Sequence, residues 1–357
     1  MDEFALSFRQ TRILFSLQYF LGTEDIDYEI DSETKRIKRQ WLNKWKASVE
    51  DLLKSQLPNN TGEDSYTLVV DLFEIKQEIE LEKRSLDKKR PLYSILMEVV
   101  LFRLYFPLRT KEDEKYIKLN LADTYRQRIV GRLESIAEWL SVEKEYVKKF
   151  KSSYERWSNE ISGSQSNPLN YLLGGLIGAA VLAVVAAAIA VPVIVPLLAP
   201  LLAPGLSGAA AISAVLAALG GGAIAAGGLG MAGGFTVIVG GGAILGASAG
   251  TGVGALFAQS PDSAVREAAK FVVSFEQVIL TQKDVAKREI ARSAKEIIKK
   301  LRHTIHSLDD QISDLQIKPD KNQEEINNLR KVNGYFRKAL EICENLLEEF
   351  LRRNALS

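Results

Sequence analysis

The chain has 357 residues, of which 25% are charged and 46% apolar, and its formal net charge is +1. A net charge this close to zero gives no electrostatic basis for a nucleic-acid partner, and we expect none. The one cysteine, Cys343, excludes an intrachain disulfide and a metal site built from several cysteines. The first residues place acids before any apolar run, which is not the pattern of a secretory signal peptide.

Residues 1–160 are predicted to form a helical domain. Two helices are expected before residue 57, and the second places Trp41 and Trp45 four residues apart on one face. The segment that Pro91 opens, LYSILMEVVLFRLYF, is apolar enough to lie at the centre of this domain.

A further helix is predicted after residue 122. Its apolar residues recur at helical spacing, at Ile129, Leu133, Ile136 and Leu140. Ser141 is expected to be the N-cap of the next helix, with Glu143 in the first turn.

The polar residues at the start of this helix are Asp123, Tyr125, Arg126 and Arg128. This arrangement resembles the TerB-like (tellurite-resistance B) all-helical domain. It is most similar to the version that precedes a Gly/Ala-rich hydrophobic region in the transmembrane-and-coiled-coil-domain family, and the resemblance covers about residues 90–258. That family also carries an α/β-hydrolase domain after the hydrophobic region. This chain has helical patterns there instead, so the resemblance does not extend to hydrolase activity.

Acidic residues in TerB-like domains have been linked to metal binding. The corresponding acids here are Glu112, Asp113, Glu114 and Asp123. Their spacing is not that of a defined Ca²⁺ loop, so we expect a solvated charged turn, no metal site and no cofactor.

Residues 169–258 form a hydrophobic region without any charged side chain, since none occurs between Glu160 and Asp262. A membrane span needs about 20 apolar residues, so several spans fit here. The candidates are Tyr171–Val191, a run from Ser207, and Gly234–Ala258. Two alternatives stay open, namely a short strand at residues 235–239 and an apolar bundle enclosed by the flanks.

Glycines recur every four residues within this region, and this spacing predicts close helix packing in lipid, where hydrophobicity does not drive association. The candidate packing residues are Gly174, Gly178, Gly230, Gly234, Gly242, Gly246, Gly250 and Gly254.

Basic residues on both sides of the hydrophobic region favour a cytoplasmic location for both flanks and an even number of spans. They are Lys148, Lys149, Lys151, Arg156, Arg266, Lys270, Lys283, Lys287 and Arg288. Trp157 precedes the first span and is a candidate interfacial anchor, whereas Trp41, Trp45 and Trp139 are expected in the core.

Residues 262–357 are predicted to contain a long antiparallel αα-hairpin. The seam of its first helix consists of Leu301, Ile305, Leu308, Ile312 and Leu315. The apolar face of its second helix consists of Leu329, Phe336, Leu340, Cys343, Leu347 and Phe350.

Three patterns match known motifs without their context. Ser248 lies in a G-x-S-x-G match without a strand or a nearby histidine. Residues 228–233 match G-x-G-x-x-G without a βαβ unit. His303 and His306 are expected on a solvated helix face rather than at a metal. We therefore expect no catalytic residue, and the chain is predicted not to be an enzyme.

The sequence as a whole predicts an all-α membrane-inserting protein, in a bacterial inner membrane. The leading hypothesis is an oligomeric pore-forming or membrane-permeabilising effector regulated by its helical flanks. Its partners would be the lipid bilayer, further copies of the chain and possible regulatory proteins. The alternative is a constitutive membrane anchor or scaffold whose helical domains bind a protein partner.

Overall fold

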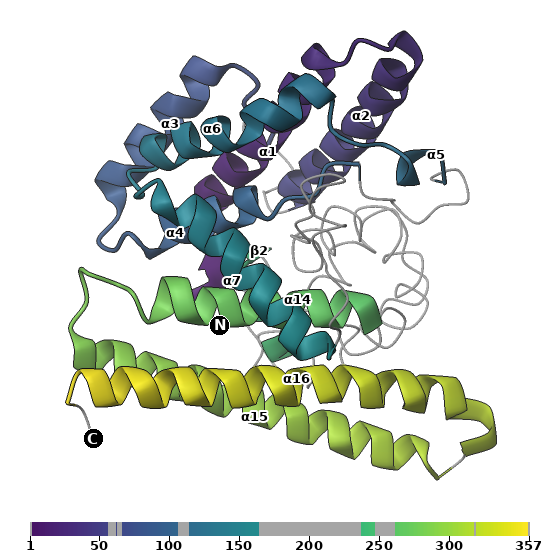
Figure 1. Cartoon of the computed structure of the whole chain (residues 1–357), viewed down its shortest axis with the longest axis vertical. Coiled ribbons are helices and arrows are strands. Elements are labelled where there is room, and N and C mark those ends of the chain that lie inside the picture. Colours follow the sequence, from purple (N-terminus) through teal and green to yellow (C-terminus); the bar gives the residue numbers. More distant parts are fainter. Residues whose placement is uncertain are drawn as a thin grey trace.

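The computed structural model describes residues 2–55, 62, 66–105, 114–163, 237–246, 261–317 and 319–355 (Figure 1). The elements in chain order are η1 (Asp2–Phe4), β1 (Ala5–Leu6), α1 (Phe8–Tyr28), α2 (Ser32–Ser55), α3 (Leu72–Ser85), α4 (Arg90–Val100), α5 (Glu114–Ile117), α6 (Asp123–Trp139), α7 (Glu145–Ser162), β2 (Val237–Ile238), η6 (Gly242–Gly246), α14 (Pro261–Ser274), η7 (Phe275–Ile279), α15 (Lys287–Leu315) and α16 (Pro319–Arg353). Apart from one short antiparallel ladder, the regular structure in these residues is helical, as predicted.

Helices α1, α2, α3, α4 and α6 form the upper layer in Figure 1. α1 begins with a capping box, in which the Ser7 hydroxyl accepts from the Gln10 N–H and the Gln10 side chain accepts from the Ser7 N–H. On α2, Trp41 and Trp45 are both buried and stack with ring centroids 6.3 Å apart, so the prediction that they share a face is confirmed. α4 lies at the centre of this layer, as predicted, and its Leu96 is fully buried.

Ser141 does not cap the next helix, contrary to the prediction. It has a φ of 54°, in the left-handed region, and the Val142 N–H bonds back to the Ala137 carbonyl over 2.9 Å. This is the hydrogen-bond pattern of a Schellman motif, so Ser141 terminates α6. α7 begins later, at Glu145, without a side-chain cap.

The lower layer consists of α14 and the antiparallel pair α15 and α16, and α7 joins it to the upper layer (Figure 1). The predicted hairpin is confirmed, because its seam residues Leu301, Leu308, Phe336 and Cys343 are fully buried. α14 packs on both α7 and α16, so residues before and after the hydrophobic region share one continuous apolar core. The sequence pattern missed this role of α14 as the element between the two layers.

The first two candidate membrane spans lie outside the described residues, and the third overlaps them only at 237–246. Those ten residues form β2, a glycine turn and the short helix η6, so the prediction of one helix over Gly234–Ala258 is wrong there. The physical reason is the left-handed backbone of Gly240 and Gly241, which no α-helix contains. The alternative of a strand within 235–239 is confirmed by β2. Within the described ranges, no helix is both long and apolar enough to cross a bilayer.

Gly131→Ala is expected to raise the free energy of unfolding by about 0.5–1 kcal/mol, because alanine restricts the unfolded chain and favours helix. Gly131 lies inside α6, and a Cβ there meets no atom within 4 Å. Urea unfolding followed by circular dichroism measures the change. Gly22→Ala is the control, because its Cβ would come 2.7 Å from Leu42 Cδ1 and should therefore not stabilise. A loss of stability in Gly131→Ala would contradict the open helical environment.

Candidate functional site

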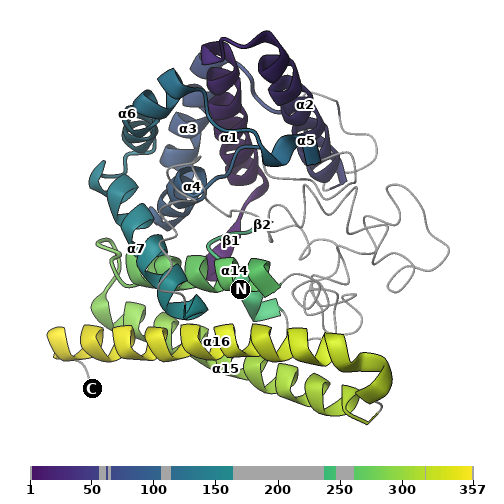
Figure 2. The same cartoon turned by 45° about the vertical axis from the view of Figure 1, so that its right-hand side comes forward.

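Residues 237–246, the described part of the hydrophobic region and near its C-terminal end, are inserted between the two layers of the molecule. β2 pairs antiparallel with β1, with Ala5 opposite Ile238 and Leu6 opposite Val237. Figure 2 shows this ladder between the upper bundle and α14. The Val239 N–H extends the pairing by donating to the Phe4 carbonyl over 2.8 Å. The start of the chain therefore holds the end of its hydrophobic region.

A glycine turn brings this segment against the backbone of α14. Gly240 and Gly241 have φ values of 64° and 71°, which side chains rarely permit. A Cβ at Gly241 would overlap the Glu267 carbonyl oxygen and the Phe271 backbone nitrogen. Only glycine fits this close approach, so the turn is a specific docking feature.

A buried ionic cluster lies under this turn. Glu98 of α4 accepts a hydrogen bond from the Gly240 N–H over 2.7 Å, and its other oxygen lies 3.1 Å from Lys270 Nζ. Lys270 Nζ is also 3.3 Å from a carboxylate oxygen of Glu267 on the same helix. All three charged side chains are at most 2% exposed. The cluster therefore links α4, α14 and the end of the hydrophobic region.

Two carboxylates share one ammonium in this cluster, and the pKa values reflect that imbalance. Burial raises the pKa of Glu98, and Lys270 offsets only part of the rise. Burial alone would lower the pKa of Lys270, but the two carboxylates raise it above its ordinary value. Because Glu98 binds its proton more readily in the folded state, its contribution to stability is complete below pH 4.5 and is lost as the pH rises through its raised pKa. Acidification therefore favours the folded state at Glu98.

Apolar side chains complete the docking of residues 237–246. Val239 and Ile244 are at most 1% exposed, and Leu245 is also buried. The Thr304 hydroxyl of α15 donates to the Leu245 carbonyl over 3.3 Å. The segment thus reaches from the upper layer to the hairpin, and this docking site, formed by α4, α14, α15 and β1, is the principal candidate functional site.

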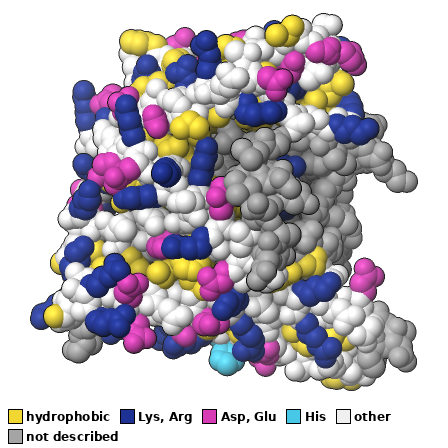
Figure 3. Space-filling view, in the orientation of Figure 1, with side chains coloured by type: hydrophobic (Ala, Val, Ile, Leu, Met, Phe, Trp, Pro, Cys, Tyr) yellow, Lys and Arg dark blue, Asp and Glu magenta, His cyan; other side chains and the backbone are white. Residues whose placement is uncertain are grey.

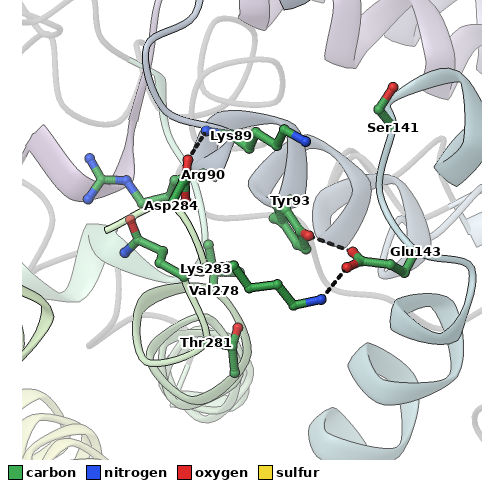
Figure 4. A pocket seen from close by; sticks show the side chains of 10 residues that line it. Lys89, Arg90, Tyr93, Ser141, Glu143, Val278, Thr281, Lys283 and Asp284 are labelled. Carbon is green, nitrogen blue, oxygen red and sulfur yellow. Dashed lines mark hydrogen bonds and ion pairs between the residues drawn. The ribbon is translucent and has the colours of Figure 1, made fainter. Parts of the chain in front are cut away.

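A second feature is a polar cleft of about 240 Å³ where the start of α4, the α6–α7 turn and the segment after η7 meet (Figure 4). Tyr93 donates to one oxygen of Glu143 over 2.5 Å, and Lys283 contacts the other over 2.5 Å. These two hydrogen bonds lower the pKa of Glu143 to about 2. Asp284 accepts from the Lys89 backbone N–H over 3.0 Å. The polar groups of the cleft form hydrogen bonds with one another. These hydrogen bonds hold the two layers together, and they leave no open ligand site among these groups.

Of the eight glycines predicted to pack membrane helices, the structure describes only Gly242 and Gly246. Both belong to η6, which contacts α14 and α15. The other six, namely Gly174, Gly178, Gly230, Gly234, Gly250 and Gly254, lie outside the described residues, as do Ser248 and residues 228–233. Packing along the whole glycine stripe stays a prediction.

Two residues assigned to the membrane flanks are instead buried in the protein. Lys270 was expected beside a span, but it belongs to the ionic cluster under the glycine turn. Trp157 was a candidate interfacial anchor, but it is 9% exposed and its indole N–H donates to Glu276 over 2.9 Å. Both corrections have the same kind of cause, a carboxylate from a distant segment, which is Glu98 for Lys270 and Glu276 for Trp157.

The remaining candidate ligands are dispersed. His303 and His306 are exposed on α15, as predicted, and Asp123 is 92% exposed, whereas Glu112 and Asp113 lie outside the described residues. Tyr125 of the TerB-like pattern is buried and donates to Glu24 over 3.2 Å. The residues that the structure describes contain no group of three or more His, Cys, Asp or Glu side chains that could hold a metal ion.

Sequence reasoning missed Glu98, Glu267 and the Gly240–Gly241 turn. A signal for the first was present, since Glu98 is the one charged residue in the apolar run from Leu92 to Phe102. A charge inside such a run needs a buried partner, and Lys270 in the similarly apolar AAKFVV stretch is the complement.

Comparison with known proteins gives no relative. The chain matches no family profile, no curated protein sequence and no solved structure.

Proposed function

We propose that this chain is a membrane-inserting protein whose uncharged region permeabilises a bilayer as an oligomer, under the control of the helical body. One observation carries the proposal. Both described ends of an approximately hundred-residue stretch without charged side chains are built into a single packed body. One end is Gly163, which terminates α7, and the other is Pro261, where α14 begins; residues 237–246, within the stretch, belong to the same body.

The position of these ends supports an even number of membrane crossings. α7 and β2 belong to one core, so a segment that leaves after α7 and returns at β2 begins and ends on the same side of a membrane. The basic flanks favoured the same topology in the sequence. Moving the connecting segments across a bilayer would also meet no charge-desolvation barrier.

The docking site supports a regulatory role for the helical flanks. Residues 237–246 are held by backbone pairing to β1, by the Gly240 N–H to Glu98 and by burial of Val239 and Ile244. Release of these contacts would free residues 237–246 from the helical body. The docked arrangement is then the restrained form of the protein.

Gly250→Leu is expected to abolish dye release from liposomes, because a bulky side chain on the glycine stripe prevents close helix packing. The purified wild-type protein is expected to release the dye. The measurement is fluorescence of a self-quenched dye after adding equal amounts of each protein. Gly334→Leu is the matched control, since the Gly334 position on α16 is open and lies outside the hydrophobic region.

Two outcomes would count against this function. If Gly250→Leu releases dye as well as the wild type does, the glycine-stripe mechanism is wrong. If the wild type stays in carbonate-washed membranes but leaves liposomes intact, the protein is a membrane anchor or scaffold instead.

A further inference from the structure

α15 carries a continuous basic surface along its exposed side. From Arg288 to Arg302 its residues recur every three or four positions, and the full set is Arg288, Arg292, Lys295, Lys299, Arg302, His303 and His306. All of them are exposed, and we call this set the basic face of α15. With a rise of about 1.5 Å per residue, the basic face extends over about 27 Å. Both histidines of the chain lie on α15, and in Figure 3 the His in view (cyan) is at the lower edge of the molecule, with both basic (dark blue) and acidic (magenta) side chains near it.

The charge of this face is neutralised by the protein only at Arg302, which pairs with Glu344 of α16 over 2.6 Å, among the residues that the structure describes. Residues 287–306 contain seven Lys or Arg and two Glu, although the whole chain has a net charge of only +1. Arg288, Arg292, Lys295 and Lys299 form no ion pair with any residue that the structure describes. On α7, by contrast, Lys149 pairs with Glu145 over 2.5 Å. The basic face is therefore a local excess of positive charge.

The opposite side of α15 contacts the end of the hydrophobic region. Ile290, Ile297 and Leu301 are buried on that side. Thr304, also buried, donates to the Leu245 carbonyl of η6. One helix diameter, about 10 Å, thus separates the basic face from the docked segment.

We propose that the basic face of α15 docks onto the anionic headgroups of a lipid bilayer. The choice of a bilayer as the partner rests on the proposed function. A straight row of unpaired cations matches a layer of anionic headgroups, and each cation near such a surface contributes to binding. A nucleic acid is the less suitable polyanion, because residues 287–315 contain no Phe, Tyr or Trp side chain on which bases would stack. Docking through this face would place the end of the hydrophobic region close to the membrane.

The test is co-sedimentation of the full-length protein with phosphatidylcholine vesicles, with and without phosphatidylserine. The variant R288E/R292E/K295E/K299E is expected to bind the anionic vesicles at least about 100-fold more weakly than the wild type. Binding to neutral vesicles is expected to be equal for the two proteins. High salt is expected to remove the preference of the wild type for anionic vesicles.

R330E/K331E/R352E/R353E is the matched control, because it makes the same change in net charge at four exposed positions on α16. It is expected to retain the preference for anionic vesicles, and circular dichroism checks that both variants are folded. The proposal is overturned if the α15 variant binds like the wild type, if the control loses as much affinity, or if the wild type prefers duplex RNA to anionic vesicles at equal salt. If the wild type binds anionic vesicles through the basic face but releases no dye from them, only the proposed function is overturned.

Discussion

Lys270→Met is expected to lower the free energy of unfolding by about 3–5 kcal/mol, because it leaves two buried carboxylates without the ammonium between them. Lys270 Nζ lies 3.1 Å from Glu98 and 3.3 Å from Glu267, and all three side chains are buried. Methionine has a similar length, so the loss measures charge rather than a large cavity. Urea unfolding at neutral pH, followed by circular dichroism, gives the value.

Glu98→Gln is the control for this cluster. Glutamine keeps an acceptor for the Gly240 N–H and leaves one carboxylate, Glu267, for one ammonium. Glu98→Gln is expected to lower the free energy of unfolding by less than half as much as Lys270→Met, since it removes the excess negative charge. Equal losses in the two variants would show that the balance of charge does not decide stability here.

Gly241→Val is expected to release residues 237–246 from the helical body and to increase dye release from liposomes. A β-branched residue at a φ of 71° costs about 1–3 kcal/mol in backbone strain alone. Its Cβ would also overlap the backbone of α14 at Glu267 and Phe271, which cannot move aside as a flexible side chain would. Hydrogen exchange at Val239 and Gly240, whose amides bond to Phe4 and Glu98, measures the release directly.

Gly334→Val is the control, because a Cβ on this exposed part of α16 meets no atom within 4 Å. It is expected to change neither hydrogen exchange at Val239 nor dye release. Faster exchange in Gly241→Val without more dye release would mean that docking of residues 237–246 does not restrain the membrane activity. Unchanged exchange would contradict the docked geometry itself.

The helices with regular apolar spacing were predictable from the sequence. Leu301, Ile305 and Leu308 form a seam whose four- and three-residue spacing is typical of a helix, and the prediction of the long hairpin followed from it. Trp41 and Trp45 likewise defined the buried face of α2. In each case the signal lies within one helix, so no knowledge of its neighbours was needed.

Residues whose role depends on a distant partner were misread. In the sequence Lys270 resembles a cation beside a membrane span. In the structure its ammonium donates to Glu98, which lies 172 positions away. In the sequence Trp157 resembles an interfacial anchor. In the structure its indole N–H donates to Glu276 inside the protein. Ser141 resembles an N-cap in the sequence. In the structure its backbone is left-handed, and the hydrogen bond between Val142 and Ala137 makes it the end of α6 instead.

The sequence by itself determined the helical class, the long hairpin and the exceptional stretch without charge, because each is a local pattern along the chain. Only the tertiary structure decided where residues 237–246 lie and what holds them. Their position depends on β1, α4 and α15, which are remote in the sequence, and on α14, the next described element. It also depends on a glycine turn that can approach the α14 backbone because glycine has no Cβ. A periodic sequence pattern does not show which backbone lies so close to the turn.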